Sequence, residues 1–309
     1  MAVVPALLVS CLLTSCRAHR PGEASAAGAP YRFLRAWGSE GNKDGQFAYP
    51  RALTLDQKGD VYVIDKSGRV QKFTREGQFL LKWELPEYAN GKPDGACVDD
   101  EGNVLIADTH YSRVLCYSPA GKLLWKLGSY GSGAGDFVFP TGVGLDADRS
   151  IYVCEYGHTD RVQKFDSRHR FLAEWGSHGE GAGQFQRPMS LALSSRGEVF
   201  VADSCNHRLE VFSRAGKLLR SFGSVGSGLG QLRFPNDVAL DAQDNVYVCE
   251  YGNHRVQKFT PAGEPLCVWG SPGSQPGQFS GPWGVAVDAE GLVYIADTGN
   301  HRVQVFAPA

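Results

Sequence analysis

Short runs of apolar residues, separated by glycine-rich turns, fill most of this 309-residue chain. Residues 284–306 show the pattern well: GVAVD, the turn AEG, VYIAD, a polar loop and RVQVF. The second and third runs are apolar at nearly every position, as strands covered on both faces are. A later run in each unit, such as FLAEW at 171–175, alternates more, as an outer strand does. The pattern therefore predicts units of four short strands.

The unit occurs six times. Aligned prolines are 43 to 48 residues apart, and each is followed fifteen residues later by an Asp or Glu and then by an Arg. The prolines are Pro50, Pro93, Pro140, Pro188, Pro235 and Pro282. The carboxylates are Asp65, Asp108, Glu155, Asp203, Glu250 and Asp297, and the arginines are Arg69, Arg113, Arg161, Arg208, Arg255 and Arg302. A role that is repeated sixfold favours structural carboxylate–Arg pairs that hold loops together.

Four-stranded units with a period near 45 residues indicate a β-propeller. The last unit ends after its third strand, at Phe306, whereas a fourth-strand pattern, RFLRAWGS, stands before the first unit at 32–39. We therefore predict an all-β fold: a six-bladed β-propeller of four-stranded blades, closed into a ring by the N-terminal strand, which completes the last blade. One propeller domain should span residues 31–309.

The consensus GSxGxxxG[QD]FxxPxGVAVDxxGxVYVADxxNHRVQxF resembles the NHL repeat, and the resemblance covers residues 31–306. It implies a six-bladed propeller but does not fix an activity. NHL relatives include extracellular sensor domains, protein- and RNA-binding modules, and peptide-amidating lyases. The lyases would have metal-binding His beside the blade prolines. Here those positions hold Arg51, Asp94, Thr141, Met189, Asn236 and Trp283, which disfavours a lyase.

The N-terminus has the character of a targeting segment. Residues 2–15 are nearly all apolar, too short to span a bilayer, and end in a lipobox-like Leu-Thr-Ser-Cys, although no Lys or Arg precedes them. We expect residues 1–16 to be a signal with Cys16 as a lipidation site, and 17–30 to be a flexible tether. The alternatives are an ordinary cleaved signal, a misassigned start or a retained anchor. The first two of these four interpretations place the protein in the bacterial cell envelope, lipid-anchored or periplasmic, with no other membrane contact.

Several chemically suggestive motifs are better explained by the fold. Glycine-rich loops such as GSYGSGAG at 128–135 lead to a Pro and a strand, not to a helix, so we predict connectors between blades rather than phosphate loops. His207, His254 and His301 share one slot in successive units, where they should diverge from the ring axis instead of converging on zinc. No cofactor is expected, with calcium or zinc as the alternatives.

Residues at which the units differ are the candidate binding site. The mouth of a propeller channel is formed just after each blade proline and by the loop after each second strand, and polar groups that converge there with aromatic residues make a default site. The candidates are Arg51, Asp94, Glu155, Tyr156, Asn236, Asp237, Glu250, Tyr251 and Trp283, with Lys66 beside them. Asp94, Asn236, Asp237 and Glu250 could also supply oxygen ligands to calcium.

These observations favour a binding or scaffold propeller of the cell envelope, which engages a protein, peptide or glycan at the channel mouth. A propeller enzyme, either an amidating-lyase-like metalloenzyme or a calcium-dependent hydrolase, is the alternative. The formal net charge of −2 provides no basic face for nucleic acid, so no such partner is expected. We expect the protein to be a monomer.

Overall fold

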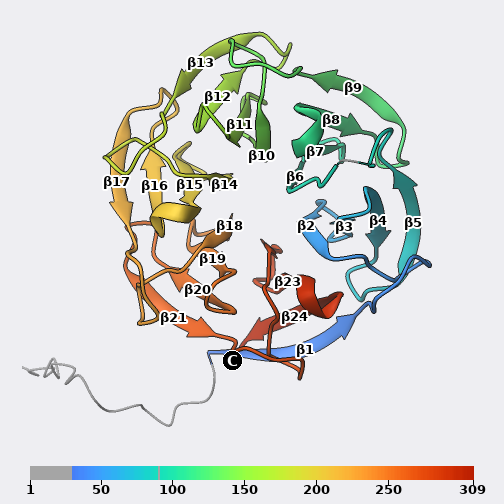
Figure 1. Cartoon of the computed structure of the whole chain (residues 1–309). Coiled ribbons are helices and arrows are strands. Elements are labelled where there is room, and N and C mark those ends of the chain that lie inside the picture. Colours follow the sequence, from blue (N-terminus) through green and yellow to red (C-terminus); the bar gives the residue numbers. More distant parts are fainter. Residues whose placement is uncertain (1–29, 90) are drawn as a thin grey trace, which may run out of the picture.

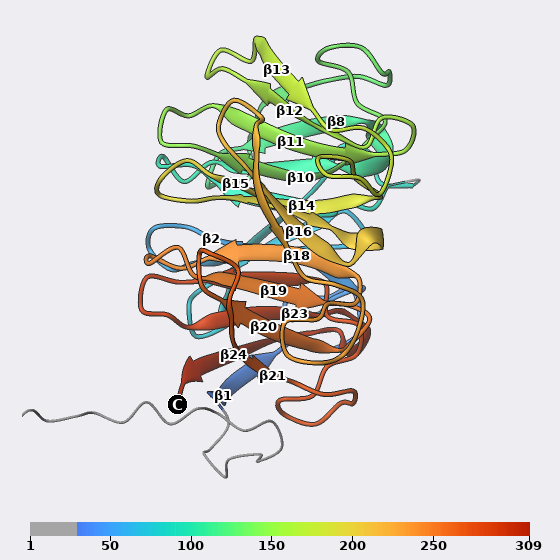
Figure 2. The same cartoon turned by 90° about the vertical axis from the view of Figure 1, so that its left-hand side faces the viewer.

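A computed structural model describes residues 30–89 and 91–309. The predicted signal, Cys16 and almost all of the predicted tether lie outside the described residues, so those predictions stay open. Six four-stranded antiparallel sheets are arranged as blades around a common axis (Figure 1). Seen from the edge, the ring is a thick disc (Figure 2). Within the described ranges, no helix has the length and apolar character needed to cross a membrane.

Each blade runs from an inner strand beside the axis to an outer strand at the rim. The inner strands are β2 (Pro50–Leu55), β6 (Gly95–Val98), β10 (Phe139–Leu145), β14 (Pro188–Leu193), β18 (Pro235–Leu240) and β22 (Gly284–Val287). The second strands are β3 (Val61–Asp65), β7 (Val104–Asp108), β11 (Ile151–Tyr156), β15 (Val199–Asp203), β19 (Val246–Glu250) and β23 (Val293–Asp297). The blades are numbered 1 to 6 in this order.

The third strands are β4 (Arg69–Phe73), β8 (Arg113–Tyr117), β12 (Arg161–Phe165), β16 (Arg208–Phe212), β20 (Arg255–Phe259) and β24 (Arg302–Pro308). The outer strands are β5 (Phe79–Glu84), β9 (Leu123–Leu127), β13 (Phe171–Trp175), β17 (Leu218–Phe222), β21 (Pro265–Trp269) and, for blade 6, β1 (Tyr31–Trp37). One-turn 3-10 helices follow the second strands of blades 2, 4 and 6: η1 (Thr109–Tyr111), η2 (Ser204–Asn206) and η3 (Thr298–Asn300).

The hydrophobic core lies between the blades. All five residues of β3 are buried because neighbouring sheets cover both of its faces, whereas β5 alternates half-buried and exposed positions. Six hydrophobic clusters each join two adjacent blades, so the core forms a ring rather than one central mass. The predicted cover of the second strands is confirmed, and the predicted alternation holds for β5 and β17 but not for β21, whose pattern runs from exposed to buried.

The ring closes as predicted, with the N-terminal strand in the last blade. Strand β1 pairs antiparallel with β24, from Tyr31 opposite Pro308 to Trp37 opposite Val303. Tyr31 also reaches blade 5: its ring stacks on Trp269 at 4.1 Å, and its hydroxyl lies 2.9 Å from the Tyr247 hydroxyl. A propeller closed in this way exposes only short outer strands, which limits edge-to-edge association.

The glycine-rich loops are connectors between blades, as predicted. Each connector that carries the motif inserts one large apolar side chain under its own loop, as Phe47 does before blade 1, where it is fully buried. Gly38 shows why a glycine is needed: its φ is +104°, and a Cβ there would lie 2.5 Å from the Phe47 ring. The loops therefore pack against protein rather than open towards a ligand.

Candidate functional site

The repeated carboxylate–Arg pair fastens each blade to the connector that precedes it. All six pairs form, for example Glu250 Oε1 to Arg255 Nε at 2.7 Å and Asp203 Oδ2 to Arg208 Nε at 2.8 Å. Glu250 also accepts the backbone N–H of Arg233 in the connector at 3.0 Å. The predicted structural role of these pairs is confirmed.

A Gln in the third strand, which the sequence analysis did not single out, also binds the blade to the preceding connector. In blade 5 the Gln257 amide oxygen accepts the backbone N–H of Gly230, and its amide nitrogen donates to the Gln231 carbonyl at 2.6 Å. Gln71, Gln163 and Gln304 make the same bonds in blades 1, 3 and 6. Its recurrence two residues after the Arg was the available signal, because a group repeated at a fixed offset indicates a scaffold role.

The three equivalent histidines clasp neighbouring blades. Nδ1 of His207 accepts the backbone N–H of Phe234 at 3.1 Å, and Nδ1 of His254 accepts that of Gly281 at 2.9 Å. His301 lies at the corresponding contact with blade 1, 3.3 Å from the N–H of Tyr49. Each ring therefore serves a different blade junction. Over residues 30–89 and 91–309, no group of three or more His, Cys, Asp or Glu side chains could hold a metal ion.

At the mouth of the channel, the residues that follow the blade prolines link the blades to one another. Arg51 forms an ion pair with Asp94 of blade 2, and its guanidinium lies 4.2 Å from the centre of the Trp283 ring in blade 6. Asn236 of blade 5 accepts the Ser204 hydroxyl of blade 4 at 3.4 Å. The side chains at the mouth are thus held in place before any ligand arrives.

Two pockets lie side by side at this mouth and share the aromatic pair Tyr251 and Trp283. The rings of this pair meet edge to face, with centres 5.6 Å apart. The apolar pocket, of about 280 Å³, is lined by Arg187, Met189, Ser204, Cys205, Phe234, Asn236, Tyr251 and Trp283. The cationic pocket, of about 270 Å³, is lined by Tyr49, Arg51, Lys66, Tyr251, His254, Ser280, Gly281, Trp283, Thr298 and Gly299.

A second aromatic group lies across blades 3 and 4. The rings of Phe139 and Tyr156 stack with centres 5.1 Å apart, and the Arg187 guanidinium lies 5.0 Å from the centre of the Tyr156 ring. Burial raises the pKa of the Tyr156 hydroxyl, so it remains a neutral donor at physiological pH. Arg187 connects this group to the apolar pocket, which it also lines.

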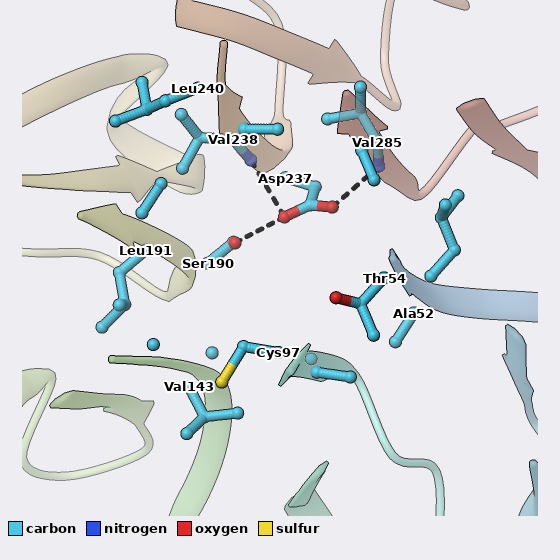
Figure 3. A pocket seen from close by; sticks show the side chains of 18 of the residues that line it. Ala52, Thr54, Cys97, Val143, Ser190, Leu191, Asp237, Val238, Leu240 and Val285 are labelled. Atoms are coloured by element: carbon cyan, nitrogen blue, oxygen red, sulfur yellow. Dashed lines mark hydrogen bonds between the residues drawn. The ribbon is translucent and has the colours of Figure 1, made fainter. Parts of the chain in front are cut away.

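The central channel holds Asp237 in a cavity of about 270 Å³ that all six inner strands line, and Asp94 also lines this cavity (Figure 3). One of the Asp237 oxygens accepts the Ser190 hydroxyl of blade 4 and the backbone N–H of Val238, and the other accepts the N–H of Val285 in blade 6 at 2.8 Å. Burial raises the pKa of Asp237 to about 6. Asp237 thus joins three blades inside the channel.

The structure brings some of the predicted site residues together and separates others. Arg51, Asn236, Tyr251 and Trp283 line the two pockets, as does the neighbouring Lys66. Asp94 pairs with Arg51, Tyr156 contacts Arg187, and Asp237 lies in the channel.

Glu155 and Glu250 are placed elsewhere. Both carboxylates are fully buried in the repeated pairs with Arg, so neither reaches the mouth. The four residues considered for calcium also bond to separate partners: Asp94 to Arg51, Asn236 to Ser204, Asp237 to Ser190, and Glu250 to Arg255. The structure does not gather them into one coordination sphere.

Sequence reasoning missed Tyr49, Arg187 and Phe234 as pocket residues. Each stands directly before a blade proline, a slot that holds Lys92, Phe139 and Gly281 in the other blades. The signal was therefore available, because this slot holds five different residue types in six blades. Comparing both positions across the blades would have identified eight of the sixteen residues that line the two pockets.

Comparisons with known proteins agree with this architecture. The NHL repeat model matches residues 185–212, 232–259 and 279–306, which lie in blades 4, 5 and 6. Protein brain tumor of Drosophila melanogaster is 29% identical over 100 residues, which cover 31% of this chain and 10% of that protein. The chain thus matches only a tenth of the length of this curated relative.

Solved structures share the fold at low sequence identity. A streptogramin B lyase structure has a TM-score of 0.65 and 14% identity, and the match covers 89% of this chain and 98% of the lyase. A Bacteroides thetaiotaomicron protein of unknown function has a TM-score of 0.70 and 18% identity, with 88% and 76% of the two chains covered. The chain therefore contains NHL repeats in blades 4, 5 and 6 and folds as a six-bladed β-propeller.

Proposed function

We propose that this propeller is a binding module that holds a segment of a partner protein at the mouth of its channel. The observation that carries the proposal is the pair of pockets separated by Tyr251 and Trp283. Each pocket is somewhat smaller than a typical small-molecule site and is suited to single side chains. Tyr251 remains 45% exposed, and exposed aromatic residues beside a pocket are typical anchors of protein interfaces.

The rigidity of the mouth supports a binding role. Asp94, Asn236 and Thr298 already bond across blade junctions, the last through its hydroxyl to the Pro50 carbonyl at 2.6 Å. Groups fixed in this way lose little conformational entropy when a partner binds, which favours affinity. The same ring of bonds ties the binding surface to the closed scaffold.

We also propose that the protein works in the bacterial cell envelope, on the strength of the apolar segment at 2–15 and the lipobox-like sequence that ends at Cys16. Metabolic labelling with a clickable fatty acid tests this, with a Cys16→Ser variant as the control. Incorporation that depends on Cys16 would support lipidation. Full recovery of the unlabelled protein in the cytosolic fraction would contradict an envelope location.

The binding proposal is tested by affinity capture of partners with three forms of the protein: wild type, Trp283→Ala, and Tyr130→Ala. Tyr130 is an aromatic residue in a connector outside the two pockets and is 77% exposed, so it controls for non-specific binding to exposed aromatic side chains. The proposal predicts a partner protein captured by the wild type and by Tyr130→Ala but lost with Trp283→Ala. A partner lost only with Tyr130→Ala, or no capture that depends on Trp283, would contradict it.

A further inference from the structure

We infer that the mouth recognises an acidic side chain placed two residues away from a large apolar side chain in an extended peptide segment. The inference rests on the proposed binding function and specifies the chemistry of the partner. It is argued from the two pockets, which differ in character although they share one aromatic wall.

The apolar pocket fits an aromatic or large aliphatic side chain. Its apolar walls come from Met189, Phe234, Tyr251 and Trp283. Met189 is 2% exposed and adaptable in shape, and the rings offer large surface with little loss of side-chain freedom. Asn236 is also buried there and already accepts the Ser204 hydroxyl, so its polar oxygen does not oppose an apolar occupant.

The cationic pocket fits a carboxylate. Arg51, Lys66 and His254 line it, and no Asp or Glu does. Arg51 shares its charge with Asp94, whereas Lys66 is exposed, lies 5.3 Å from the centre of the Tyr49 ring, and forms no ion pair with any described carboxylate. Lys66 is therefore the cation best placed to pair with an incoming acid.

His254 adds a donor to the same pocket. Its Nδ1 accepts the N–H of Gly281 at 2.9 Å, so the neutral ring carries its proton on Nε2. The apolar pocket is likewise lined by one cation, Arg187, and by no Asp or Glu. The charge across both pockets is thus positive, although the whole chain is slightly negative, and it complements an acidic partner.

The spacing follows from the common wall. In an extended chain, side chains two residues apart point to the same side and are separated by roughly 7 Å. The pockets share the Tyr251–Trp283 pair as their common wall, so we expect neighbouring same-side side chains of one strand to enter both. A carboxylate next to the apolar residue in sequence would point away from the surface.

A random-peptide phage library, selected in parallel on the wild type and on Trp283→Ala, tests the inference. The wild type should enrich peptides with Asp or Glu two positions from Phe, Tyr, Trp, Leu or Met, and Trp283→Ala should not. Trp283-dependent peptides without such an acid would overturn the inference and leave the proposed function intact. If no peptide binds in a Trp283-dependent way, both the inference and the proposed function are contradicted. Binding of glycans alone on an array would contradict both as well.

A charge swap tests the cationic pocket directly. A synthetic enriched peptide should bind Lys66→Glu at least about tenfold more weakly than the wild type, and changing its acid to Lys should restore much of the loss. Lys126→Glu provides the matched control, because Lys126 is an exposed lysine on the outer strand β9. Equal weakening by both variants, or no rescue by the Lys peptide, would overturn the pairing with Lys66.

Discussion

Glu250 and Tyr251 are neighbours in sequence but belong to two different regions of the molecule. Glu250 is fully buried and makes the same pair with Arg that occurs in every blade. Tyr251 is 45% exposed and forms the wall between the two pockets at the mouth. The blade interior is repeated six times, whereas the six residues that follow the prolines at the mouth are all different.

The difference shows that adjacent residues of a repeat protein can have separate roles, one in the scaffold and one at the binding surface. Groups that recur at one offset hold the strands and connectors together, and they do so with buried charges and amides. Groups that vary between blades face a shared opening and can carry specificity. A reactive-looking side chain is therefore best judged first by whether its slot is repeated.

The largest expected effect comes from breaking the repeated pair. In Glu250→Ala, Arg255 loses its carboxylate and the Arg233 N–H loses its acceptor. The free energy of unfolding, measured by urea denaturation, should fall by about 3–5 kcal/mol. The folded fraction should still bind the partner. A loss below about 1 kcal/mol would mean that the pair contributes little to the scaffold.

The channel carboxylate should give the next largest effect, as a dependence on pH. The pKa of Asp237 is raised from 3.8 to about 6, so the folded protein binds its proton more tightly than the unfolded chain does. Stability contributed by this group therefore decreases as pH rises from 4 to 6. At about 1.4 kcal/mol per pH unit, the contribution amounts to roughly 3 kcal/mol.

Asp237→Asn should remove this contribution, because an amide does not titrate. The test compares urea denaturation of the wild type and the variant at several pH values between 4 and 8. The variant should gain stability relative to the wild type as the pH rises to 6, and the difference should then level off. A difference that does not change with pH would show that Asp237 titrates normally in the fold.

A smaller effect, on binding rather than on stability, should follow from Tyr251→Ala. Loss of the shared wall should weaken partner binding by about 2 kcal/mol, or roughly thirtyfold, because both pockets lose one side. The free energy of unfolding should change by less than about 1 kcal/mol, since the ring is half exposed. Calorimetric titration and urea denaturation of the same preparation separate these effects. A stability loss larger than the binding loss would place Tyr251 in the scaffold.

The smallest expected effect is a gain of stability in blade 4. Glu210 stands where Gln257 stands in blade 5, and one of its buried carboxylate oxygens has no hydrogen-bond partner among the described residues. Glu210→Gln supplies a donor for the Gln184 carbonyl and should stabilise the fold by about 1 kcal/mol at pH 7. Burial raises the pKa of Glu210, so the gain should shrink towards pH 4, where the acid is protonated. A destabilised variant at pH 7 would contradict this assignment.

The fold could be predicted almost completely from the sequence, because the period, the aligned prolines and the displaced fourth strand all act through local patterns. The mouth was only partly predictable. Arg51, Asn236, Tyr251 and Trp283 were found by asking where the blades differ. Glu155 and Glu250 looked equally distinctive, yet the change from Asp to Glu lengthens the side chain without moving it out of the buried pair.

Side-chain contacts between residues far apart in the sequence were not predicted. The bond from the Ser190 hydroxyl to Asp237 joins residues 47 apart in sequence, and that from the Val285 N–H joins residues 48 apart, so no short motif reveals them. The order of blades around the ring does bring such residues together. Combining the repeat alignment with blade adjacency would therefore recover contacts that a single repeat cannot show.

Site-specific photo-crosslinking tests the central claim most directly. A photoreactive phenylalanine analogue replaces Tyr251 in one preparation and Tyr130 in another, and both are exposed to the same partner under identical light. We predict crosslinks to the partner from position 251 and none from position 130. Crosslinks from position 130 alone, or equal yields from both positions, would contradict binding at the mouth.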